Sequence, residues 1–176
     1  PPPAAGPARL PPPSFSPVNK AALRDRILAQ LRSDLDLQTR AAQVSRDEAI
    51  SEESRPENQY DMHSQEAAYL AEGQARLAAD IATSIALYET LVLPAFAPDA
   101  PAAVGALIEV ETRTGRQWYF LGPRSGGLEF QIDGQTILVL TPPSPLGRAF
   151  LGKRAGDIVA MPGRDAAAGQ RILTVL

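Results

Sequence analysis

The stretch between Val18 and Arg55 most constrains the fold, because it contains neither glycine nor proline, the residues that most readily interrupt a helix. Asn19, a residue type that caps helix N-termini, stands at its start. Within the stretch, apolar side chains recur every four residues, at Leu23, Ile27, Leu31 and Leu35. A helix of about 30 residues rises about 45 Å. That length is too great for a compact domain in a chain of 176 residues.

A second helical pattern follows an interruption at Pro56 and runs from about Glu57 to Leu91. Small residues along it, including Gly73 and several alanines, permit close approach of two helices. Its predicted apolar stripe has spacings of seven, four, four and three residues and consists of Leu70, Leu77, Ile81, Ile85 and Tyr88. Two such helices with a short connection predict an antiparallel coiled-coil hairpin. The alternative, a helical bundle, needs further helices that the chain lacks.

The connection between the two helical patterns is acidic. Arg55 is the only countercharge among six carboxylates, which are Asp47, Glu48, Glu52, Glu53, Glu57 and Asp61. Because like charges this close together repel one another, we expect the connection to be exposed to solvent.

After Pro94, Pro98 and Pro101 the pattern changes to short runs rich in β-branched residues. Asp133-Gly134 is the clearest hairpin turn. Ser144 is a predicted N-cap for one short helix that extends to Leu151. Strands are predicted over residues 104–111, 116–122, 127–132, 136–140, 157–161 and 171–176. These elements predict a small antiparallel sheet wrapped on one helix, an α+β domain.

Trp118, Tyr119 and Phe120 are consecutive in one predicted strand. Strand alternation predicts that either Tyr119 or the other two are buried, with the opposite side at a surface. Aromatic residues make up only 6 % of the chain. That is too few to build the aromatic cage of a prolyl isomerase pocket, so isomerase activity is not expected.

The segment from Thr141 to Asp157 reads T-P-P-S-P-L-G-R-A-F-L-G-K-R-A-G-D. It resembles the C-terminal domain of the GreA/GreB transcription elongation factors, whose fold is similar to that of FK506-binding proteins. Glu72-Gly73 matches the Glu-Gly of the family's second helix. The resemblance implies an N-terminal antiparallel coiled-coil hairpin followed by a small antiparallel-sheet domain with one short helix.

Four segments are predicted on these grounds. Residues 1–17 form a Pro-rich disordered tail, and residues 18–92 form the coiled-coil hairpin. Residues 93–102 form a linker, and residues 103–176 form an FK506-binding-protein-like domain that docks on polymerase.

The resemblance also implies a function. Gre factors bind bacterial RNA polymerase and insert the hairpin tip into its secondary channel, where they promote transcript cleavage in backtracked complexes. The expected partners are therefore the polymerase and the 3′ end of the nascent RNA. The chain is not expected to be an enzyme on its own, but to stimulate the polymerase's intrinsic cleavage. It is expected to bind no cofactor in isolation and to share Mg²⁺ with the polymerase active site.

At the family's tip, an Asp-x-x-Glu-Asn motif places carboxylates near the polymerase's catalytic magnesium. The matching residues 54–58 read S-R-P-E-N, so that Glu57 and Asn58 fall on the family's Glu and Asn. Glu57 is thus the implied ligand of the shared Mg²⁺, only in the polymerase complex. Glu53 and Asp61 are further candidates for tip carboxylates that act in trans.

Ser54 occupies the position of the family's Asp, and a hydroxyl is a weaker magnesium ligand than a carboxylate. This difference favours an alternative function, a non-cleaving regulator that occupies the channel and competes with Gre factors. The acidic residues also have a purely structural interpretation, as a solvated hairpin turn beside a helix N-terminus.

The family's docking turn reads Asp-Ser-Pro and meets a coiled coil at the rim of the polymerase channel. The matching residues are Pro143, Ser144 and Pro145, with proline in place of the Asp. The structural alternative is that Ser-Pro simply starts a helix whose Leu146 and Phe150 belong to the core.

Composition excludes several other functions. The chain has no cysteine and one histidine, so disulfides and thiolate metal sites are absent and a transition-metal site is disfavoured. A net charge of −3 argues against broad nucleic-acid binding. No apolar run approaches the roughly 18 residues of a membrane span, and no signal peptide is visible. We expect a cytoplasmic monomer with no membrane partner.

Overall fold

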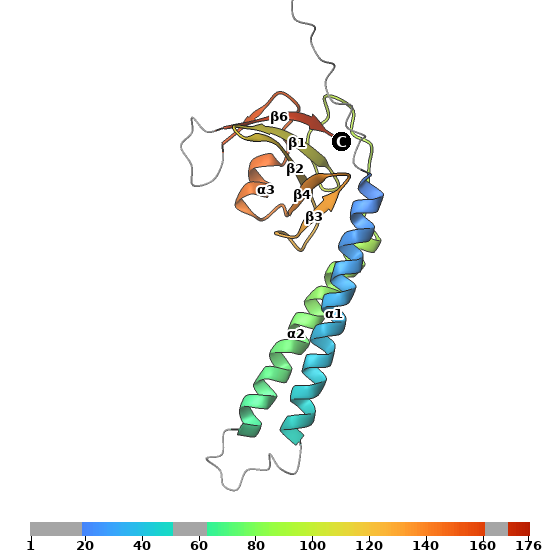
Figure 1. Ribbon diagram of the computed structural model, residues 1–176, viewed down its shortest axis with the longest axis vertical. Helices are drawn as coiled ribbons and strands as arrows, with labels where there is room; N and C mark the ends of the chain where they lie inside the picture. Colours follow the sequence, from blue (N-terminus) through green and yellow to red (C-terminus); the bar gives the residue numbers. More distant parts are fainter. Residues whose placement is uncertain (1–18, 51–62, 161–168) are drawn as a thin grey trace, which may run out of the picture.

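The computed structural model describes residues 19–50, 63–160 and 169–176. Two long helices, α1 (Lys20–Ile50) and α2 (His63–Glu89), form a hairpin that projects from a six-stranded sheet (Figure 1). The side chain of Asn19 accepts hydrogen bonds from the backbone N–H groups of Ala21 and Ala22, at 3.0 and 3.2 Å. The predicted N-cap and the predicted fold class, a helical hairpin followed by a small sheet with one short helix, are therefore confirmed.

The seam between the helices is only partly the one predicted. Ile81, Ile85 and Tyr88 face α1, as expected, but Leu70 and Leu77 are 59 % and 53 % exposed. In their place, the seam continues toward the tip through smaller or polar side chains, at Ala67, Ala71, Gln74 and Ala78. This line follows on from Ile81 at spacings of three and four residues, and its small side chains allow the helices to approach closely.

The sheet has the strand order β3-β4-β2-β1-β6-β5. Its strands are β1 (Leu107–Thr112), β2 (Gly115–Leu121), β3 (Glu129–Ile132), β4 (Gln135–Leu140), β5 (Ile158–Val159) and β6 (Gln170–Val175). Every pairing is antiparallel except that of β2 with β4, so the predicted antiparallel sheet contains one parallel pair and is mixed.

The mixed pairing arises because β3 is an edge strand that belongs to the connection between β2 and β4. Parallel neighbours require a crossover connection, and β3 lies within it. The chain then turns at Asp133 and Gly134, whose φ values of 50° and 76° confirm the predicted hairpin turn, and β4 returns beside β2.

Both faces of the sheet are buried at the C-terminal half of β2. Trp118 and Phe120 pack with the base of the hairpin, while Tyr119 packs against Phe150 with ring centroids 5.1 Å apart. The expectation that one side of this strand lies at a surface is therefore wrong, because the hairpin base covers the face opposite the short helix (Figure 1).

The predicted limits of the four segments, residues 1–17, 18–92, 93–102 and 103–176, stay predictions.

Candidate functional site

The predicted tip residues Glu53, Ser54, Glu57, Asn58 and Asp61 lie outside the described residues. Their catalytic and magnesium-binding roles therefore stay predictions. The structure does describe the helices on either side of the tip segment: α1 ends at Ile50, and α2 begins at His63. Among the described residues, no group of three or more His, Asp or Glu side chains is placed to hold a metal ion.

The base of the hairpin is fixed to the sheet by Tyr88. This residue is fully buried, and its hydroxyl donates a 2.8 Å hydrogen bond to the backbone carbonyl of Arg124. A Cβ added at Gly122 would lie 2.1 Å from the Tyr88 hydroxyl oxygen, so glycine is required beside it. Burial raises the pKa of Tyr88. The spacing of apolar residues predicts Tyr88 as part of the apolar stripe, but no pattern in the sequence pairs it with Gly122.

Leucine and isoleucine side chains of α1 complete this joint. Leu23 and Ile27 are fully buried in the same cluster as Tyr88 and Phe120. A second contact near the base links the two helices, where the guanidinium of Arg32 donates to the Glu89 carboxylate at 2.7 Å. The hairpin therefore leaves the sheet from a packed base.

The predicted docking turn precedes α3 (Pro145–Phe150), with Ser144 as its N-cap. The Ser144 hydroxyl accepts a 2.9 Å hydrogen bond from the Gly147 N–H and donates a 2.8 Å bond to the Thr141 carbonyl. A Cβ at Gly147 would lie only 1.9 Å from that carbonyl oxygen. The T-P-P-S-P-L-G part of the motif thus has a local structural purpose.

The three predicted docking residues differ in exposure. Pro143 and Pro145 are exposed, whereas Ser144 is half-buried and its hydroxyl is engaged within the turn. The guanidinium of Arg148 donates to the Pro143 carbonyl, which ties the turn to the helix. A groove of about 470 Å³ lies beside the turn, lined by Gly126, Gly127, Leu138, Val139, Leu140, Thr141, Ser144, Pro145 and Leu146.

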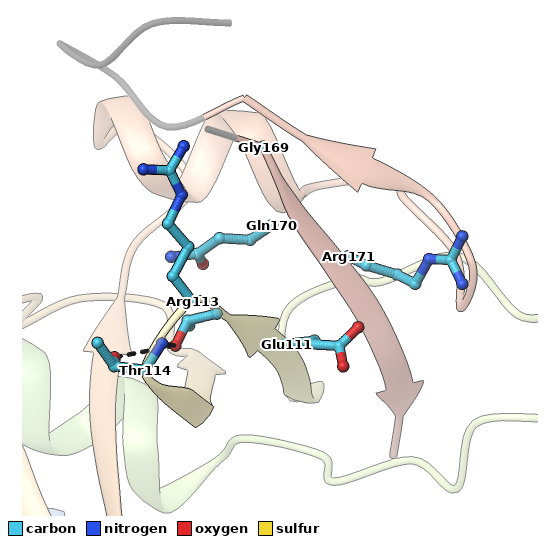
Figure 2. Close-up of a pocket in the computed structure, with 7 residues that line it drawn as sticks. Glu111, Arg113, Thr114, Gly169, Gln170 and Arg171 are labelled. Carbon is cyan, nitrogen blue, oxygen red and sulfur yellow. Dashed lines mark hydrogen bonds between the residues drawn. The ribbon is translucent and has the colours of Figure 1, made fainter. Parts of the chain in front are cut away.

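A separate polar pocket of about 430 Å³ lies where β1 meets β2 and β6 (Figure 2). Arg113 and Arg171 line it, and their side chains point in different directions. Glu111 is paired in register with Arg171 across β1 and β6. The pocket therefore presents charges of both signs. No pattern in the sequence predicts it.

Comparisons with known proteins yield a likeness in structure alone. No family model matches the chain, and no curated protein sequence matches it. None of the described helices is long and apolar enough to cross a membrane.

Three solved structures are similar over most of their length. GreA factor homolog 1 (Gfh1) of Thermus thermophilus is 18 % identical, with 91 % of this chain and 96 % of that chain covered and a TM-score of 0.34. Gfh1 of Thermus aquaticus is 20 % identical, with 90 % and 96 % covered and a TM-score of 0.35. A further structure of the transcription factor Gfh1 is 18 % identical, with 86 % and 92 % covered and a TM-score of 0.35. Values this low leave the function to be inferred from the residues of this chain itself.

Proposed function

We propose that this chain is a Gre-like transcription factor that binds bacterial RNA polymerase and extends its hairpin into the secondary channel. The observation that supports this most is the packed base of a long hairpin. Leu23, Ile27 and Tyr88 are fully buried against the sheet, and α1 alone rises about 45 Å beyond its start. A hairpin fixed at one end can deliver its tip into a channel too narrow for a globular domain.

The docking surface in this proposal is the turn before α3. Pro143 and Pro145 present two rigid rings to solvent, and the hydrogen bonds of Ser144 hold them in place. The carbonyl of Pro143 is already bound by Arg148. Since proline stands where the family has Asp, contact at this turn depends on shape rather than on charge.

At the tip, the proposed action is to promote cleavage of the transcript near its 3′ end in backtracked complexes. Two Mg²⁺ ions stabilise the attacking and leaving oxygens in phosphoryl transfer. Glu57 and Asn58 offer the oxygen ligands that Mg²⁺ prefers. Glu57 is the proposed ligand of the shared ion, and Glu53 or Asp61 is the proposed second carboxylate. The isolated chain holds no cofactor and cleaves no RNA; it acts as a monomer in the cytoplasm.

RNA cleavage in a stalled, backtracked bacterial elongation complex with Mg²⁺ tests this function. The intact chain is expected to shorten the transcript, and Glu57→Ala is expected to abolish the effect. Glu129→Ala is the matched control, since it removes an exposed carboxylate from β3 and should leave cleavage unchanged. Absence of polymerase binding by the intact chain would refute the proposal as a whole.

Ser54 supports the second candidate function, a channel-occupying regulator that does no chemistry and competes with Gre factors. In that case the intact chain binds polymerase and displaces a Gre factor without shortening the transcript. The variant Ser54→Asp then discriminates between a misplaced tip and an incomplete one. Gain of cleavage would show that the tip already reaches the catalytic magnesium and lacks only a carboxylate.

A further inference from the structure

The half of the hairpin nearer the tip, residues 34–50 and 63–80, exposes large apolar side chains. The exposed fraction is 63 % for Leu37, 67 % for Val44, 59 % for Leu70 and 53 % for Leu77. We call these four residues the apolar face. Exposed large apolar side chains that gather on one part of a protein mark a candidate site of interaction.

The four side chains lie on one side of the hairpin. Ser45 and Gln74, whose side chains are 3.1 Å apart, mark where the helices face each other. An α-helix has 3.6 residues per turn. Counted from Ser45 and Gln74 at this spacing, Leu37 and Val44 of α1 lie on the same side of the helix–helix contact as Leu70 and Leu77 of α2. The opposite side carries a distinct groove of about 480 Å³, lined by Thr39, Ala42, Gln43, Arg46, Ile50, Ala68, Ala71, Glu72 and Ala75.

The shape of the apolar face suits a helical partner. Its residues are seven positions apart on each helix, which is the heptad repeat of coiled coils. Between Leu70 and Leu77, a Cβ added at Gly73 would meet nothing within 4 Å. A hollow is present there, lined by Tyr69, Leu70, Gly73, Gln74 and Leu77. A side chain from a facing helix can enter such a hollow as a knob enters a hole.

The charge of this half of the hairpin indicates which helix fits. Residues 34–50 and 63–80 contain three basic side chains, Arg40, Arg46 and Arg76. They contain seven acidic ones, which are Asp34, Asp36, Asp47, Glu48, Glu66, Glu72 and Asp80. Arg46 and Glu72 line the opposite groove. Without them, two basic and six acidic side chains remain, a net charge of −4. A second copy packed on the same face would bring these carboxylates together, whereas lysines and arginines beside an apolar stripe would complement them.

We infer that the apolar face binds an amphipathic helix of a partner protein, with basic residues on both flanks of its apolar stripe. The inference goes beyond the proposed function and holds whether or not polymerase is the partner. The contact joins the apolar ridge of that helix to Leu37, Val44, Leu70 and Leu77, with the knob position at Gly73.

The test uses the full chain and a synthetic four-heptad peptide with Leu at positions a and d and Lys at e and g. Lysine repulsion disfavours pairing of this peptide with itself. Calorimetric titration is expected to show one-to-one binding, and a peptide with Glu at e and g is expected not to bind. Leu70→Ser combined with Leu77→Ser is expected to weaken binding at least tenfold. Both residues are exposed, so circular dichroism should show unchanged helix content.

The matched control is Ala68→Ser combined with Ala75→Ser, which places the same hydroxyls on the opposite groove and should leave affinity unchanged. Three results would overturn the inference: no binding of the basic peptide, equal binding of both peptides, or unchanged binding after the double leucine substitution. Analytical ultracentrifugation of the chain alone can give a fourth result that would overturn the inference. A dimer that disappears in the double leucine variant would show that a second copy, and not a basic helix, covers the face.

Discussion

The two ends of the hairpin are built from the same kind of helix but stabilised in different ways. At the base, Leu23, Ile27 and Tyr88 are fully buried between the helices and the sheet. Toward the tip, the contact between the two helices consists of small or polar side chains, while Leu70 and Leu77 remain more than half exposed. The comparison shows that apolar content alone does not measure how strongly a segment is held. Burial against a second layer does, and local stability should therefore fall from base to tip.

The largest effect should come from truncating matched apolar residues at the two ends. Ile27→Ala at the base removes a fully buried side chain and is expected to cost about 2–5 kcal/mol of the free energy of unfolding. Leu37→Ala in the distal half removes a side chain that is 63 % exposed, and is expected to change it by less than about 0.5 kcal/mol. Urea denaturation measures both. Equal losses would mean that the two ends are stabilised alike.

A smaller loss of stability should come from adding a methyl group at the base of the hairpin, where Tyr88 packs against the sheet. Gly122→Ala places a methyl group where the Tyr88 hydroxyl lies, since the distance would be 2.1 Å. The ring must move, and overpacking of this kind costs about 1–3 kcal/mol. Thermal denaturation measures the loss. If a Tyr88→Phe background removes most of this loss, the clash with the hydroxyl is its main cause. A smaller loss should remain, because the added Cβ would also lie 3.1 Å from Tyr88 Cζ and 3.2 Å from Val139 Cγ1.

The helices of the hairpin and their caps could be predicted from the sequence. Which side chains of α2 are buried and which are exposed could not. The glycine-free stretch, the Asn19 cap and the Ser144-Pro145 helix start predicted elements that the structure confirms, because each depends on local chemistry. Leu70 and Leu77 were misplaced because a heptad stripe and its neighbouring seam differ by one helical position. Only the packing of the partner helix selects between them.

The differences between the predicted and the observed sheet also arise from contacts between segments that are distant in the sequence. Trp118 and Phe120 were expected on the opposite side of their strand from Tyr119, and they are, but the sequence did not reveal that the hairpin base covers them. The parallel pairing of β2 with β4 depends on where a distant strand returns. For the site, the structure confirms Ser144 as the cap of a short helix, while the docking role of the turn and the roles of the tip carboxylates stay predictions.

A third prediction concerns the Tyr88 hydroxyl alone. Tyr88→Phe leaves the Arg124 carbonyl without its donor and should lower the free energy of unfolding by about 1–2 kcal/mol near neutral pH. Burial raises the pKa of Tyr88 above the ordinary value of 10.0, so the unfolded chain ionises first. The stability conferred by this shift is fully present below pH 10 and lost as the pH rises above it. The gap between wild type and Tyr88→Phe should therefore narrow in alkaline buffer, as urea denaturation at each pH would show.

The smallest effect should be a gain, in the distal half. Gly73 lies inside α2, and a Cβ added there would meet nothing within 4 Å, so Gly73→Ala costs no contact. Alanine is favoured over glycine in a helix interior by about 0.5–1 kcal/mol. If the hairpin unfolds in one step with its base, that gain should appear in the global free energy of unfolding. Ala75→Gly, two positions along the same helix, should lose a similar amount.

Hydrogen exchange distinguishes this from separate opening of the tip. If the distal half opens before the base, Gly73→Ala should slow exchange of amides near the tip while leaving the global unfolding unchanged. A gain in both measurements would join the two ends into one cooperative unit. A gain confined to the tip amides would mean that the sheet stabilises the base alone, and that the apolar face belongs to the least stable part of the fold. In that case a helical partner on this face would have a second effect, since any ligand that binds only the folded hairpin also stabilises it.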